Sequence, residues 1–102
     1  MIINKTPHPV NIVDGPVFPA CPKEELIRLA VSVQPAKSID NIPTSVTVFG
    51  EPVGLPDYQE GIWYIVSQLV KSALPNRVDL LVPADVARDA DGTIIGCRSL
   101  GR

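Results

Sequence analysis

The single histidine of this chain lies in a short proline-rich motif, Thr6-Pro7-His8-Pro9. The flanking prolines stiffen the segment, so the imidazole of His8 would be presented at little entropic cost. Such a ring could contact a ligand or act as a general base, or it could bond a nearby carbonyl as an ordinary turn residue. No second ligand stands at i+2 or i+4, and the sequence predicts no metal site.

Arginine and aspartate occur together twice, as Arg77-Val78-Asp79 and as Arg88-Asp89. On a strand, Arg77 and Asp79 would point to the same face. The flat fork of donors on arginine suits phosphate or carboxylate, and a neighbouring aspartate could orient it or accept from a ribose hydroxyl. The alternative is a surface ion pair that contributes less than ~1 kcal/mol.

Aromatic residues offer a third kind of contact. Trp63 and Tyr64 are adjacent, so on a strand one would enter the core and the other would face a pocket or an interface. Tyr58, in the proline- and glycine-rich stretch from 51 to 61, is suited to stacking on a flat ligand. The sequence contains no nucleotide-binding glycine motif, no serine-hydrolase elbow and no zinc-protease motif, so no catalytic residue is predicted.

Composition sets bounds on the class of protein. The chain has 102 residues, a formal net charge of −2 and 45% hydrophobic residues, which predicts one globular domain over residues 1–102. Nine scattered basic residues argue against binding to nucleic acid. Cys21 and Cys97 are expected to be free thiols in a reducing compartment, and no apolar stretch approaches the ~20 residues of a membrane span. We therefore expect a cytoplasmic protein without a cofactor.

Eleven prolines cut the chain into short pieces that disfavour long helices. Period-two alternation or β-branched runs predict strands, of which the strongest is the aromatic and aliphatic segment at 62–66. Ser67 can cap a short helix from Gln68 to Leu74, which Pro75 would stop. The other predicted strands cover residues 10–13, 27–34, 45–49, 77–82, 86–89 and 93–100, and residues 1–4 form a short apolar opening.

Loops are predicted at 35–43 and 51–61, and Asp91-Gly92 is typical of a hairpin turn. The expected fold is mainly β: a small antiparallel sheet, sandwich or partly open barrel of six to seven short strands with one short helix. An α+β sheet is the alternative, and it would follow if Lys23 to Ala30 formed a helix.

Several segments together resemble a family of small, largely uncharacterised proteins encoded by bacteriophages and prophages. The resemblance spans nearly the whole chain, and it is moderately specific as a set, although none of its motifs is specific alone. Its motifs are Asn4-Lys5-Thr6-Pro7-His8-Pro9-Val10, Tyr64-Ile65-Val66-Ser67, Arg77-Val78-Asp79-Leu80, Arg88-Asp89 and Gly92-Thr93-Ile94-Ile95-Gly96-Cys97.

The resemblance implies a phage setting, in the cytoplasm of the infected bacterial host. Small oligomeric phage proteins include counter-defence factors, some of which sequester nucleotide immune signals in pockets completed between subunits. By analogy with them, Arg77 and Arg88 would hold phosphates, while His8 and Tyr64 would touch a base or ribose. The ligand-binding residues expected from the pattern are Thr6, His8, Tyr64, Ser67, Arg77, Asp79 and Arg88.

Three functions are consistent with the sequence. The first is a homo-oligomeric protein that sequesters a nucleotide-derived signal of the cyclic ADP-ribose type and so blocks a bacterial defence system. The second is a protein-interaction or virion accessory module without a small-molecule ligand. The third is a small nucleotide-cleaving enzyme that uses His8 as its base.

Overall fold

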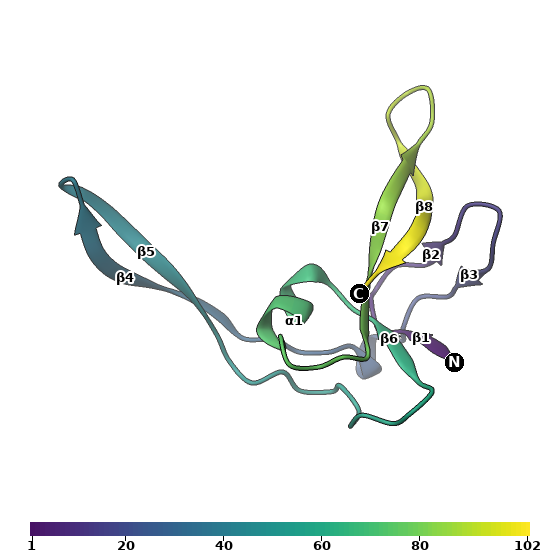
Figure 1. Ribbon diagram of the computed structural model, residues 1–102, viewed down its shortest axis with the longest axis horizontal. Helices are drawn as coiled ribbons and strands as arrows, with labels where there is room; N and C mark the ends of the chain where they lie inside the picture. Colours follow the sequence, from purple (N-terminus) through teal and green to yellow (C-terminus); the bar gives the residue numbers. More distant parts are fainter.

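The computed structural model describes all 102 residues and confirms a mainly β fold (Figure 1). The strands form a four-stranded sheet and two separate two-stranded sheets. The elements are β1 (Ile2–Asn4), β2 (Val10–Asn11), β3 (Val17–Phe18), β4 (Val31–Ile39), β5 (Ile42–Phe49), β6 (Trp63–Ile65), α1 (Gln68–Ala73), β7 (Leu80–Arg88) and β8 (Ile94–Gly101), with a single 3-10 turn at Lys23–Glu25.

The four-stranded sheet has the order β1-β6-β7-β8. Only its β7–β8 pair is antiparallel, because β1, β6 and β7 run parallel to one another. The sheet is therefore mixed, where the sequence predicted antiparallel pairing throughout. Parallel neighbours need a crossover connection, and the long segment after β1 and the helix after β6 supply them.

The core lies on the two faces of β6. Ile65 points to one face, where it packs with Val10, Leu81 and Cys97. Tyr64 and Val66 point to the other face and pack with Val70 of α1 and Leu80 of β7. Successive strand residues alternate between faces, so one short strand anchors both halves of the core. The prediction of a buried central strand at 62–66 is confirmed.

Helix α1 lies where the sequence predicted it. The hydroxyl of Ser67 accepts a hydrogen bond from the backbone N–H of Val70 at 3.3 Å and so caps the helix. The helix ends at Ala73, two residues before Pro75, which cannot continue a helix. This cap fixes Ser67 directly after β6.

The predicted loop at 35–43 is wrong, because these residues complete a long antiparallel hairpin of β4 and β5. Asp40 and Asn41 have φ angles of 51° and 64°, the two left-handed residues that a two-residue hairpin turn requires. The prolines at 35 and 43 do not end the strands, since both strands are edges that need no donor on their outer side. The α+β alternative fails because Lys23 to Ala30 forms only one 3-10 turn.

The β7 strand also runs through a proline that the sequence predicted as its end. Pro83 pairs with Leu100 inside the β7–β8 hairpin, and the strand continues to Arg88. The turn predicted at Asp91-Gly92 is confirmed: Gly92 has a φ of 83° and lies between the two strands.

The β4–β5 hairpin extends away from the rest of the molecule as an arm (Figure 1). The principal extents are 51 × 39 × 24 Å and the radius of gyration is 16.4 Å. A compact chain of this length would have a radius of gyration of about 13 Å. Residues 31–49 thus lie largely outside the core.

Candidate functional site

The parallel pairing of β1 with β6 brings two of the predicted site residues, Thr6 and Ser67, close together. Asn4 pairs with Ile65, and the backbone N–H of Lys5 donates to the carbonyl of Ile65 at 2.9 Å. Thr6 lies two residues after the end of β1, and Ser67 lies two residues after the end of β6. The pairing of the two strands therefore places Thr6 close to Ser67. These two residues line one open depression of about 180 Å³, together with Lys5, Pro7, Leu26, Ile27 and Val70.

Asn4 holds the loop that carries Thr6 and His8. Its buried side-chain amide donates to the carbonyls of His8 at 2.9 Å, Phe18 at 3.3 Å and Pro19 at 3.1 Å. Its Oδ1 accepts from the backbone N–H of Thr6 at 2.9 Å and from the Thr6 hydroxyl at 2.7 Å. One side chain thus ties the proline-rich loop to the segment after β3. The two hydrogen bonds to Asn4 hold Thr6 in place. The side chain of His8, two residues further along the loop, is exposed.

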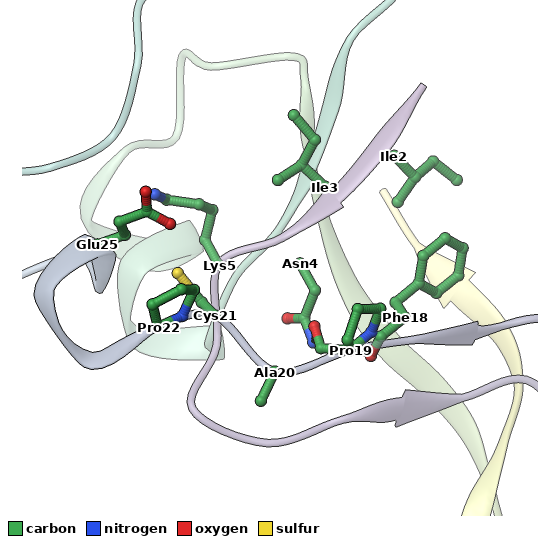
Figure 2. Close-up of a pocket in the computed structure, with 10 residues that line it drawn as sticks. All are labelled: Ile2, Ile3, Asn4, Lys5, Phe18, Pro19, Ala20, Cys21, Pro22 and Glu25. Carbon is green, nitrogen blue, oxygen red and sulfur yellow. Dashed lines mark hydrogen bonds between the residues drawn. The ribbon is translucent and has the colours of Figure 1, made fainter.

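A second depression, of about 290 Å³, lies on the other side of Lys5 (Figure 2). Its lining includes Ile3, Cys21 and Glu25, and Figure 2 shows the Lys5 side chain reaching toward Glu25 above Cys21. Lys5 belongs to the lining of both depressions, and its side chain turns toward the carboxylate of Glu25 on the side of the second one (Figure 2).

Arg77 and Asp79 form an ion pair with two parallel hydrogen bonds. Nε of Arg77 donates to Oδ1 of Asp79 at 2.8 Å, and an Nη donates to Oδ2 at 2.7 Å. The same Nη also donates to the carbonyl of Pro56 at 3.0 Å. The hydrogen bonds from Arg77 lower the pKa of Asp79, and the bonds to Asp79 raise the pKa of Arg77. The pair thus anchors the 51–61 segment to the start of β7.

Asp79 is 1% exposed, so this is not the surface ion pair of the alternative interpretation. Its backbone carbonyl also accepts from the N–H of Tyr64, which is buried in the core. Tyr64, Arg77 and Asp79 therefore form one cluster, whose polar groups bond mainly to one another and to the 51–61 segment.

Arg88 lies at the other end of β7. Its guanidinium donates to the carbonyl of Gly92 at 2.8 Å across the hairpin turn. Asp89 stabilises the same turn through bonds from the N–H groups of Asp91 and Thr93. At ~3.3 Å per residue the nine residues of β7 separate its two ends by roughly 25 Å. One subunit therefore does not bring Arg88 and Arg77 to the same phosphate group.

The predicted site residues thus fall into three groups. Thr6 and Ser67 converge beside the loop of His8, the cluster of Tyr64, Arg77 and Asp79 is held by its own ion pair, and Arg88 stands at the hairpin turn. The sequence prediction missed Asn4 and Lys5, which organise and charge the first group. The sequence feature that could have indicated Asn4 and Lys5 is their position between an apolar segment and the Thr6-Pro7 turn. No group of three or more metal-ligating side chains forms anywhere in the structure.

Comparison with models of known protein families, with curated proteins and with solved structures finds no match. The structure contains no helix with the length and apolar character needed to cross a membrane.

Proposed function

We propose that this protein is a non-catalytic binding protein of the phage type that sequesters a nucleotide-derived signal, of the cyclic ADP-ribose type or a related one. The observation that carries the proposal is the convergence of Thr6 and Ser67, 61 positions apart in the sequence, in one open depression beside Lys5. Both hydroxyls were expected to contact ligand, and the ammonium group supplies the charge that a phosphate requires.

The chemistry of this group suits an anion. A lysine acts as a compact point charge toward phosphate. The hydroxyl of Ser67 accepts from the N–H of Val70 and keeps its proton for a phosphate oxygen, whereas the Thr6 hydroxyl donates to Asn4 and would have to turn to reach a ligand. The exposed imidazole of His8 stands on the adjoining loop, within the same rigid segment, and would meet the ribose or base. Asn4 pre-orders the loop, which lowers the entropy lost on binding.

The size of the depressions bears on the number of subunits. Pockets for drug-sized ligands commonly measure ~300–1,000 Å³, whereas the two depressions measure about 180 and 290 Å³. A single chain would cover only part of a dinucleotide-sized ligand. The proposal therefore places the pocket between subunits of a homo-oligomer.

The phosphate contacts are assigned to Lys5 in preference to Arg77. Two of the three guanidinium nitrogens of Arg77 already donate within the chain. Moving this arginine to a ligand would leave Asp79 buried without its partner, which is costly. The roles expected for Arg77 and Arg88 in ligand binding stay predictions.

Native mass spectrometry of the protein, purified from cells with an active nucleotide-signalling defence, tests the proposal. We expect a bound nucleotide that is released unaltered on denaturation. A nucleotide of the panel that is chemically changed after incubation with the protein would favour the enzyme alternative. An empty protein that also fails to bind a panel of cyclic ADP-ribose isomers in calorimetry would refute the proposal.

A charge-matched pair of variants locates the site. Lys5→Ala removes a charged partner of the ligand, which contributes ~1.5–3 kcal/mol and corresponds to a roughly 10- to 100-fold weaker Kd in calorimetry. Lys71→Ala makes the same charge change on α1, outside the lining of either depression. Equal losses in both variants would mean that only the general charge of the protein matters.

A protein-interaction or virion accessory module is the second candidate. The observation that favours it is the apolar surface of the β7–β8 hairpin, on which Val86, Ile94 and Ile95 are exposed. Exposed apolar groups of this kind often mark partner-binding surfaces. Co-purification of a defined phage or host protein, with no nucleotide bound, would support this candidate over the first.

A further inference from the structure

The accessible surface of the chain is larger than that of a monomer of its mass. The area is 7243 Å² for 11.0 kDa. Monomeric proteins of this mass expose about 5,600 Å² by the usual scaling of area with mass, so the excess is about 1,600 Å². Only 11 of the 102 residues are buried, which is a small core for such a chain. The surface therefore has the extent of a subunit separated from its partner.

The arm formed by β4 and β5 carries six exposed large aliphatic residues. Two of them, Val31 and Val33, lie on one face near its base, and the other four lie on the opposite face. Ile39 lies directly opposite Ile42 across the hairpin. Val46 and Val48 occupy alternate positions after Ile42 on β5 and so point to the same face. The exposed fractions are 65% for Ile39, 64% for Ile42, 50% for Val46 and 39% for Val48. We call these four residues the apolar arm face.

The arm lacks the support that a hairpin needs. A two-stranded hairpin alone is at best marginally stable in water. Neither strand of the arm joins another sheet, and the arm contributes no residue to either core cluster. Figure 1 shows the hairpin standing clear of the body along most of its length. Burial of the apolar arm face against another chain would supply the missing stabilisation.

The edges of the arm are less suited to a partner than its faces. Pro35 lies in the middle of β4 and Pro43 near the tip of β5. A proline offers no N–H to an added strand, and prolines on edge strands oppose edge-to-edge pairing. A partner is therefore expected to pack on the face of the arm and not to extend its sheet.

Charge and area favour a second copy of this chain as the partner. Residues 31–49 contain only two charged side chains, Lys37 and Asp40, so two arms do not repel each other. In a twofold dimer the same patch serves both subunits. Obligate homodimers bury roughly 1,000–2,500 Å² on each subunit and have apolar interfaces, a range that contains the excess surface estimated above.

We propose that the β4–β5 hairpin is an oligomerisation arm that packs its apolar face against a second copy of this chain. The inference deepens the proposed function, because it names the surface that brings subunits together around the ligand. The two can fail separately: a monomer that still binds nucleotide would overturn the arm proposal and the placement of the pocket between subunits, but not nucleotide binding, and an oligomer without ligand would overturn only the proposed function.

Two neighbouring residues on β5 provide a matched test. Val46→Lys places a charge on the apolar arm face, whereas Thr47→Lys places the same charge on the opposite face one residue away. Light scattering coupled to size exclusion, from about 1 to 100 µM protein, measures the mass of each form. We expect an oligomeric wild type, a dissociation constant raised at least ~30-fold in Val46→Lys, and a much smaller change in Thr47→Lys.

Hydrogen exchange provides a readout that does not depend on these variants. Amides of residues 31–49 should be protected in the wild-type oligomer and should lose protection as dilution separates the subunits. The fluorescence of Trp63, in the body of the molecule, checks that each variant keeps its core. A monomeric wild type at 100 µM, an unprotected arm, or equal effects of the two lysine substitutions would each overturn the proposal.

Discussion

Replacement of Arg77 by alanine should strongly destabilise the fold. The substitution leaves the carboxylate of Asp79, which is 1% exposed, without the two hydrogen bonds that it accepts at 2.7 and 2.8 Å. It also frees the carbonyl of Pro56 in the middle of the long 51–61 segment. Removing one partner of a buried ion pair typically costs about 3–5 kcal/mol. This is a large part of the 5–15 kcal/mol that stabilises an ordinary small domain.

The dependence on pH separates this mechanism from simple loss of packing. The pKa of Asp79 is lowered in the folded state by its bonds to Arg77. The resulting stabilisation is fully present above the unfolded-state pKa of about 3.9 and is lost as the pH falls through the lower folded-state pKa. Without Arg77, burial raises the pKa of Asp79 in the folded state. The difference in unfolding free energy between wild type and Arg77→Ala should therefore be largest at neutral pH and shrink as the pH falls and Asp79 becomes protonated.

Urea denaturation followed by the fluorescence of Trp63, repeated between pH 3 and 8, measures this difference. Arg77→Met combined with Asp79→Leu is the control, because replacing both partners by apolar groups of similar size leaves no buried charge and should cost less than Arg77→Ala alone. A loss below 1 kcal/mol for Arg77→Ala at pH 7, or a loss that is independent of pH, would refute the assigned role of the pair.

Two further predictions concern the backbone around the candidate site. Asn4→Ala should cost about 2–3 kcal/mol in urea denaturation, because the carbonyls of Phe18 and Pro19 lose the amide of Asn4 and the N–H of Thr6 loses its acceptor; a cost below 0.5 kcal/mol would contradict this role. Gly96→Ala should cost about 1–3 kcal/mol, since its Cβ would lie 2.7 Å from the carbonyl oxygen of Asn11 and push β2 from β8. Gly92→Ala, whose Cβ would meet no atom within 4 Å, is the control and should lose only about 1 kcal/mol through its positive φ. Equal losses at the two glycines would show that the close approach of β2 is unimportant.

Part of the candidate site could be predicted from the sequence. Thr6 and Ser67 were both expected as ligand contacts from the family resemblance, and the structure places them in one depression. Their contact with a ligand stays a prediction. The paired carboxylate and guanidinium of Arg77 and Asp79 were also expected to share a face. What the sequence did not reveal was that Asp79 would be buried, since its burial depends on β6 packing beside β7. The same limit hid Asn4, whose three acceptors come from a neighbouring loop and from residues 14 and 15 positions away.

The sequence by itself determined the elements that depend on local physics. A nearly continuous aromatic and β-branched run specified the central strand β6, the hydroxyl of Ser67 specified the start of α1, and Asp91-Gly92 specified the β7–β8 turn, because each signal acts over a few residues. Only the tertiary structure decided the parallel pairing of β6 with β1 and β7 and the continuation of β4 and β7 through prolines. A period of two shows that a segment is a strand, but it does not show which strand lies beside it. That choice depends on contacts between distant segments, and those contacts also decide where the depressions lie and why the arm stands alone.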